Sequence, residues 1–154
     1  MIKVLFICHG NICRSPMAEF VLKDMVEKRG IADKFFIGSA ATSTEEIGNT
    51  VHPGTRNKLN SVGISSEGKF AVQLRKYDYN SYDYIIGMEW VNINNILRIV
   101  GGDPLGKVYK LLDFTDKPRD IDDPWYTGRF DDTYTEVCEG CEAFLKYLEK
   151  EGLI

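Results

Sequence analysis

Near its N-terminus the chain reads Val4-Leu5-Phe6-Ile7-Cys8-His9-Gly10-Asn11-Ile12-Cys13-Arg14-Ser15-Pro16. The apolar run at 4–7 is short and rich in branched and aromatic residues, which is typical of a buried strand. Gly10 and Asn11 tolerate a positive φ and therefore indicate a turn. Ser15 and Pro16 are typical of a helix cap and of a first helical residue. The stretch predicts a strand, a tight loop and the start of a helix.

The loop between this strand and this helix has the composition of an oxyanion site. Unpaired N–H groups at a helix N-terminus attract anions, and successive loop amides can surround a phosphate. Arg14 can bind two oxygens of that phosphate, and together with the helix N-terminus it favours the thiolate form of Cys8. We therefore expect Cys8 to attack phosphorus and form a cysteinyl-phosphate, with Ser15 donating a hydrogen bond to the sulfur. The alternative is a buried cysteine and a surface arginine in an ordinary strand–helix turn.

The string from Cys8 to Pro16 resembles the phosphate loop of the low-molecular-weight protein tyrosine phosphatases. Cys8 and Arg14 with five residues between them match the nucleophile and the phosphate-binding arginine of the cysteine-dependent phosphatases. The resemblance implies a metal-free, cofactor-free hydrolase that acts on phosphotyrosine proteins or aryl phosphates and releases inorganic phosphate. It also implies that the loop binds phosphate through the residues after the nucleophile, namely His9, Gly10, Asn11, Ile12, Cys13 and Ser15.

Elsewhere in the chain, strand and helix patterns alternate. We expect further strands at 35–37, 84–88 and 108–112, helices at 53–62, 90–100 and 131–151, loops at 40–51 and 114–128, and short helical turns at 65–80. Such alternation predicts an α/β fold in one domain, a three-layer sandwich whose central four-stranded parallel sheet carries helices on both faces. In such a sheet the site lies at the carboxyl ends of the strands, where the Cys8 loop is expected.

Length and composition limit the class of protein. A chain of 154 residues with 44% hydrophobic content suits one globular domain. The net charge of −4 and the lack of a basic stripe argue against nucleic-acid binding. No apolar run approaches the roughly 20 residues that span a bilayer, and no signal peptide is evident. We therefore expect a cytoplasmic protein that is a monomer or a weak dimer.

Expulsion of an alkoxide or phenoxide requires a general acid on a loop that reaches the pocket. The best candidate segment is Asp122-Asp123-Pro124-Trp125-Tyr126. Pro124 stiffens the chain and restricts the residue before it. The family carries its acid immediately before a proline, so the resemblance assigns Asp123 as acid and then as base. The alternative is an Asp-Pro turn without a catalytic role.

Two loops are expected to form the walls of the pocket. Trp125 and Tyr126 would form an apolar slot for an aryl group, although Trp125 could instead pack below the last helix. By resemblance, the 40–51 loop forms the opposite rim, which places Glu45 and Glu46 there. These carboxylates would disfavour acidic residues on either side of a phosphotyrosine, or they are ordinary solvated charges.

Asn11 is expected to adopt a left-handed conformation and to tie the loop together through its amide. By resemblance, Ser39 meets it from the second strand. Some family members support this network with a histidine- and arginine-containing segment, and the matching segment 69–73 has neither residue.

The chain has four cysteines, Cys8, Cys13, Cys138 and Cys141. The resemblance suggests a reversible disulfide between Cys8 and Cys13, and the alternative is that Cys13 packs beneath the loop. Cys138 and Cys141 lie within a helical pattern without a second pair, which favours core packing over zinc binding or redox chemistry.

Three rival functions share parts of this pattern. An arsenate reductase of the same fold would use the thiolate loop but needs resolving cysteines, and none lies between Cys13 and Cys138. A non-catalytic phosphotyrosine-binding module would not need Asp123. A thiol oxidoreductase built on Cys138 and Cys141 would need that pair to follow a strand.

Overall fold

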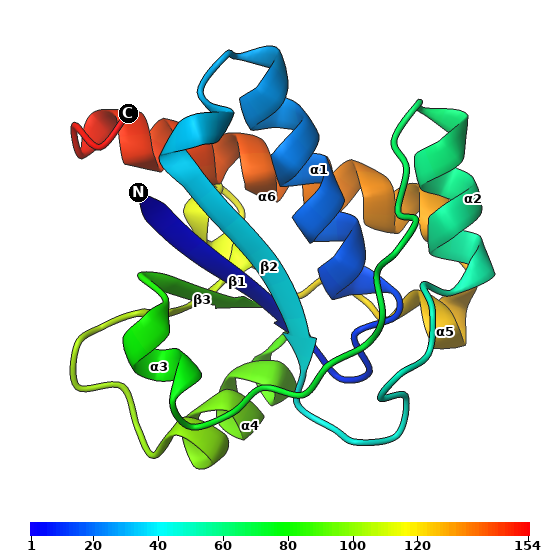
Figure 1. Cartoon of the computed structure of the whole chain (residues 1–154), viewed down its shortest axis with the longest axis horizontal. Helices are drawn as coiled ribbons and strands as arrows, with labels where there is room; N and C mark the ends of the chain where they lie inside the picture. Colours follow the sequence, from blue (N-terminus) through cyan, green and yellow to red (C-terminus); the bar gives the residue numbers. More distant parts are fainter.

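A computed structural model describes residues 1–154, and a parallel sheet lies at its centre (Figure 1). The strands are β1 (Ile2–Cys8), β2 (Phe35–Ala41), β3 (Tyr84–Gly87) and β4 (Val108–Lys110), in the spatial order β2-β1-β3-β4. Each neighbouring pair is parallel. The expected α/β class with a four-stranded parallel sheet is confirmed.

Helices cover both faces of the sheet. They are α1 (Arg14–Lys28), α2 (Pro53–Ser61), α3 (Asp78–Ser81), α4 (Trp90–Val100), α5 (Pro124–Thr127) and α6 (Phe130–Lys150), with 3₁₀ turns η1 (Ala32–Lys34) and η2 (Leu111–Phe114). Helices α1 and α6 lie together on one side of the sheet, and α3 and α4 lie on the other (Figure 1). None of the helices is both long and apolar enough to span a bilayer.

Strand β1 joins the two halves of the core because its side chains alternate between the faces. Val4, Phe6 and Cys8 belong to the core cluster beneath α1 and α6. Leu5 and Ile7 belong to the smaller cluster beneath α4. Each such buried aliphatic or aromatic side chain stabilises the fold by about 1.5–3 kcal/mol. The Cys8 loop therefore follows a strand whose side chains are buried on both faces of the sheet.

Several expected boundaries were wrong. Strand β2 continues through Ala41, beyond its apolar run at 35–37 and the end expected at Gly38-Ser39, because β1 pairs with it along its whole length. Strand β4 stops at Lys110, since residues 111–114 turn into η2. The expected loop at 114–128 contains the short helix α5.

The segment at 65–80 also differs from the expected run of helical turns. Much of it is extended beside the end of β2, with isolated bridges from Gln73 to Ala41 and from Phe70 to Thr50. Only α3 within it is helical. This arrangement depends on pairing with distant residues, which the local sequence does not specify.

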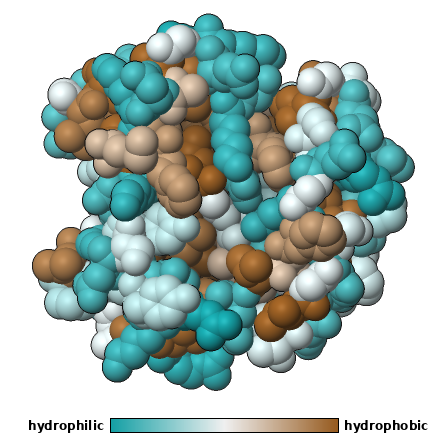
Figure 2. Space-filling view, in the orientation of Figure 1, coloured by the Kyte–Doolittle hydropathy of each residue, from teal (hydrophilic) through white to brown (hydrophobic).

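Hydrophilic residues cover much of the face seen in Figure 1, with hydrophobic residues scattered among them (Figure 2). Such isolated apolar residues are normal on a folded protein.

Candidate active site

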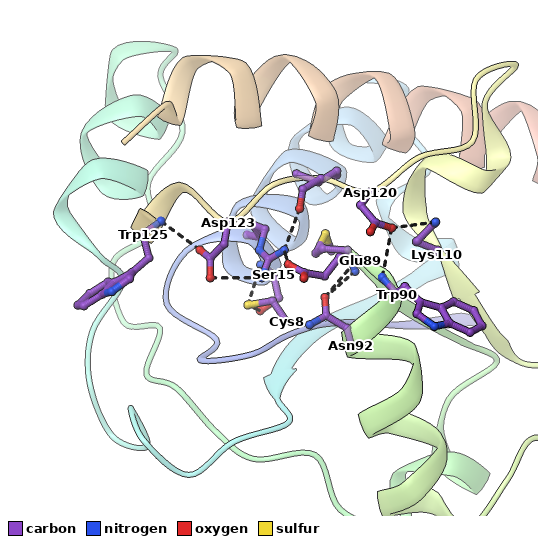
Figure 3. A network of polar contacts seen from close by, with 12 residues as sticks. Cys8, Ser15, Glu89, Trp90, Asn92, Lys110, Asp120, Asp123 and Trp125 are labelled. Carbon is purple, nitrogen blue, oxygen red and sulfur yellow. Dashed lines mark hydrogen bonds and ion pairs between the residues drawn. The ribbon is translucent and has the colours of Figure 1, made fainter. Parts of the chain in front are cut away.

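The Cys8 side chain is surrounded by hydrogen-bond donors at the carboxyl end of β1. Its Sγ accepts hydrogen bonds from the backbone N–H groups of Asn11 at 3.3 Å and Ser15 at 3.5 Å. The Ser15 Oγ lies 3.0 Å from the same sulfur (Figure 3). Three hydrogen-bonding groups therefore approach the Cys8 sulfur.

Asn11 holds the turn of this loop in shape. Its φ of 58° makes it the one non-glycine residue with a positive φ, as its sequence position indicated. The side-chain Nδ2 donates to Ser15 Oγ at 2.8 Å and to Ser39 Oγ at 2.9 Å. The Oδ1 accepts from the backbone N–H of Val72 at 3.1 Å. Both N–H donors and the oxygen of this buried amide are thus directed to the loop and its support.

Arg14 is only 2% exposed, although it is charged. Its Nη1 donates to the Glu89 carboxylate and, at 2.8 Å, to the carbonyl of Ile121. Its Nη2 lies 3.4 Å from Asp123 Oδ2, whereas its Nε has no partner within the protein. Burial acts to lower the pKa of Arg14, but Cys8, Glu89 and Asp123 outweigh it, so the pKa is raised. The guanidinium stays charged and keeps a free donor for an anion.

Glu89 is itself fixed by its neighbours at the start of α4. The Asn92 Oδ1 accepts hydrogen bonds from the backbone N–H groups of Met88 at 3.0 Å and Glu89 at 3.1 Å (Figure 3). Asp120 accepts from the Trp90 backbone and pairs with Lys110 at 2.9 Å. These contacts anchor the two segments that hold the outer end of Arg14.

Asp123 reaches the loop from the far side of the pocket. It caps α5, because its Oδ1 accepts a hydrogen bond from the Trp125 backbone N–H at 3.0 Å. The other oxygen faces Arg14, and the side chain is 21% exposed. The neighbouring Asp122 is exposed to solvent.

A pocket of about 110 Å³ opens over the loop. Its lining consists of residues that the sequence had indicated, namely Cys8, His9, Gly10, Ile12, Cys13, Arg14, Glu45, Glu46, Asp123, Trp125 and Tyr126. Asn11, Ser15 and Ser39 are buried and support the loop instead of lining the pocket. Trp125 is 56% exposed and contacts the edge of His52, so it does not pack below the last helix.

The 40–51 loop supplies the opposite rim. Glu45 pairs with His9 Nε2 at 3.0 Å. Glu46 lies close over the Cys8 loop, since a Cβ added at Gly10 would lie 3.3 Å from its Cγ. Gly10 therefore permits a close approach that a larger residue would hinder.

Comparison with known proteins agrees with this geometry. Residues 3–153 match the family model for the low molecular weight phosphotyrosine protein phosphatases. The chain belongs to this family. It is therefore an enzyme of the protein-tyrosine-phosphatase class.

The relatives of this phosphatase match it over nearly their whole length. It is 39% identical over 153 residues to the Bacillus subtilis low molecular weight protein-tyrosine-phosphatase YfkJ, covering 98% of each chain. The crystal structure of YfkJ has a TM-score of 0.94, with 98% of this chain and 96% of that chain covered. A protein tyrosine phosphatase from Entamoeba histolytica is 29% identical, with a TM-score of 0.91 and coverage of 99% and 100%.

All four cysteines of the phosphatase are free thiols. Burial, followed by the nearby Cys8, raises the pKa of Cys13 far above its usual range. Cys141 is fully buried in the core beneath α1 and α6, and Cys138 packs against the same cluster. No group of three or more His, Cys, Asp or Glu side chains is arranged to hold a metal ion.

Sequence reasoning missed four residues around the site. Glu89 lies two residues after the end of β3 and could have been found, because the carboxyl ends of parallel strands share one edge. The Ile121 carbonyl gave no signal. Neither did Glu19, whose carboxylate accepts a hydrogen bond from the Ser39 hydroxyl. Lys69 lies in the 69–73 segment that the resemblance matches to the support of the loop, but its contact with the Ser39 carbonyl was not expected.

Proposed function

We propose that this phosphatase hydrolyses phosphotyrosine, in proteins or in small aryl phosphates, through a cysteinyl-phosphate on Cys8. The observation that carries the proposal is the convergence of Cys8, Arg14 and Asp123 on one pocket of about 110 Å³. These are a nucleophile, an oxyanion-binding group and a proton donor, which together are sufficient for phosphoryl transfer without a metal.

In the first step the Cys8 thiolate attacks phosphorus while the bond to the phenolic oxygen breaks. Arg14 and the amides of the loop bind the non-bridging oxygens, whose charge is retained in the transition state. Asp123 in its protonated form gives its proton to the departing phenolate. The products are tyrosine and a phosphorylated Cys8.

In the second step Asp123, now a carboxylate, removes a proton from water. The water oxygen attacks phosphorus, the S–P bond breaks, and inorganic phosphate leaves. Ser15 stabilises the departing Cys8 thiolate, because its hydroxyl lies 3.0 Å from the sulfur. The free enzyme is restored with no net change in its protons.

The rival functions lack a structural basis of this kind. An arsenate reductase would pass a disulfide to further cysteines, but Cys138 and Cys141 lie on α6, away from the pocket lining. A binding module would have no use for the carboxyl group of Asp123 inside the pocket. One structural relative, 27% identical with a TM-score of 0.85, is a Drosophila arginine phosphatase, so phosphoarginine belongs in the substrate panel.

The test is rapid acid quenching during turnover of a ³²P-phosphotyrosine peptide. We expect labelled protein in the wild type, with the label on the peptide that contains Cys8. The Cys8→Ser variant should show neither label nor turnover, whereas Cys138→Ser should behave as wild type. Turnover of arsenate or phosphoarginine without turnover of phosphotyrosine would refute the proposal.

A further inference from the structure

Trp125 is an exposed wall of the pocket with little support from the core. Its side chain is 56% exposed, and it belongs to none of the hydrophobic clusters. Its backbone N–H donates to Asp123 at 3.0 Å, which fixes the start of α5 but not the indole (Figure 3). An exposed side chain that is ordered only when a ligand binds reduces the affinity for that ligand. The indole therefore needs a neighbour that holds it beforehand.

That neighbour is the ring of His52. The centroids of the two rings lie 5.5 Å apart, and their planes are inclined at 76°. This is the edge-to-face arrangement that aromatic pairs prefer. His52 supplies the one aromatic contact of the Trp125 indole.

The His52 ring is itself held in three ways. The backbone N–H of His52 donates to the Ile12 carbonyl in the Cys8 loop at 2.9 Å. The Nδ1 accepts a hydrogen bond from the Gly54 N–H at 3.0 Å and thereby caps α2. The ring stacks on Phe130, with the centroids 5.1 Å apart and the planes inclined at 18°. A ring that is both a helix cap and part of a stack has a defined orientation.

Phe130 connects this stack to the Cys8 loop. It packs against the small cluster of Ile12, Cys13 and Ala71. A Cβ at Gly54 would overlap the Phe130 ring, so the glycine permits this close approach. The rings of Phe130, His52 and Trp125 thus form a row that leads from the Cys8 loop to the wall of the pocket.

We propose that His52 determines how strongly the pocket selects an aryl group, because its imidazole holds the Trp125 indole in place as a preformed wall. His52 is a positioning residue, since it acts through Trp125 and does not itself line the pocket. The inference rests on the aryl phosphate substrate of the proposed function. In that function the phosphate binds at the Cys8 loop, so His52 should affect the aryl part of a ligand and not the phosphate part.

The test compares benzylphosphonate and methylphosphonate, two non-hydrolysable ligands that share the phosphonate group. Their dissociation constants follow from the protection of Cys8 against iodoacetamide, with labelling measured by fragment mass spectrometry. His52→Asn removes the ring but keeps a side-chain acceptor that can cap α2. Because the indole must then be ordered on binding, we expect the dissociation constant of benzylphosphonate to rise by about two- to tenfold. That of methylphosphonate should not change.

Two further measurements separate positioning from loss of structure. His52→Phe keeps an aromatic ring but has no acceptor for the Gly54 N–H. It should lower thermal stability and retain the wild-type ratio of the two dissociation constants. In a Trp125→Ala background the wall is absent, so His52→Asn should cause no further loss of benzylphosphonate affinity.

An unchanged dissociation constant of benzylphosphonate in His52→Asn would overturn the proposal. So would an equal weakening of both ligands, because His52 would then act on the Cys8 loop through Ile12. A full further loss in the Trp125→Ala background would also refute it. Protection of Cys8 needs no turnover. The role of His52 can therefore fail while phosphotyrosine hydrolysis stands, and hydrolysis can fail while His52 still governs the binding of an aryl ligand.

Discussion

The Arg14 guanidinium lies 3.4 Å from the Asp123 carboxylate (Nη2 to Oδ2), although the two residues come from distant parts of the sequence. In the proposed mechanism, this contact joins the end of the pocket that binds phosphate to the end where the leaving group departs. The same guanidinium keeps its Nε without a protein partner. A bound phosphate would therefore meet Arg14 and the acid side by side.

Replacing the acid should matter most for poor leaving groups. We expect Asp123→Asn to reduce kcat on a phosphotyrosine peptide by about 10²–10⁴-fold, because tyrosine leaves slowly without a proton. The loss on p-nitrophenyl phosphate should be smaller, since p-nitrophenolate needs less help to leave. Steady-state kinetics on both substrates measure the difference. Asp122→Asn, which changes an exposed neighbour, is the matched control, and an equal loss in that variant would contradict the assignment.

Glu89 should position Arg14 for phosphate. Glu89→Gln removes a charged acceptor from Nη1, and a hydrogen bond to a charged group is worth about 1.5–3 kcal/mol. Because Glu89 is partly exposed and the Ile121 carbonyl remains, we expect roughly the lower end of that range, about a tenfold rise in the inhibition constant of inorganic phosphate. Competitive inhibition at fixed pH measures it. Glu142→Gln, an exposed change on α6, should have no effect.

The two cysteines of the loop should differ in reactivity. Burial and the nearby Cys8 raise the pKa of Cys13, so its thiol stays protonated at neutral pH. We expect iodoacetamide at pH 7 to modify Cys8 and to spare Cys13, as fragment mass spectrometry would show. Equal labelling of Cys8 and Cys13 would contradict the raised pKa of Cys13.

The same shift predicts the sign of a pH effect on stability. An unfolded Cys13 ionises near its ordinary value of 9.0, whereas the folded protein retains the proton. Unfolding therefore releases a proton above pH 9, and the free energy of unfolding falls as the pH rises. Urea titrations at pH 8 and pH 10 would measure the change, and Cys13→Ala should reduce it.

Gly140 should be required by packing between α6 and η2. A Cβ at this position would lie 2.5 Å from the Cγ of Leu111, which is fully buried. Although alanine favours helix more than glycine does, we expect Gly140→Ala to lower the free energy of unfolding by about 1–3 kcal/mol. Urea unfolding measures it. In a Leu111→Ala background, Gly140→Ala should lower the free energy of unfolding much less. An equally large loss in that background would show that the contact with Leu111 is not the cause.

The turn of the Cys8 loop could be predicted from its sequence because it depends on near neighbours. The turn at Asn11 follows from the few residues that accept a positive φ. The helix that Ser15 and Pro16 predicted is present, but α1 starts at Arg14 with Cys13 as its N-cap, and the Ser15 hydroxyl contacts Cys8 instead of capping the helix. The alternation of strands and helices then gave the parallel sheet, and a parallel sheet places a loop of this kind at its carboxyl edge.

The boundaries and the surroundings of the site could not be predicted in the same way. Strand β2 is longer than its apolar run because the ladder with β1 extends it to Ala41. Asp123 was assigned through a resemblance, and its contact with Arg14 exists only because the strand order brings the two segments together.

By itself the sequence determined the strand, the turn between Cys8 and Arg14 and the presence of a helix after it, because steric limits on the backbone act between near neighbours. Only the tertiary structure decided what holds that loop. Glu89 and the Ile121 carbonyl reach Arg14 across 75 and 107 residues. Lys69 meets Ser39 across 30 residues. Such partners depend on which strands and segments lie side by side. Contacts between distant parts of the chain are not specified by the local sequence of either part.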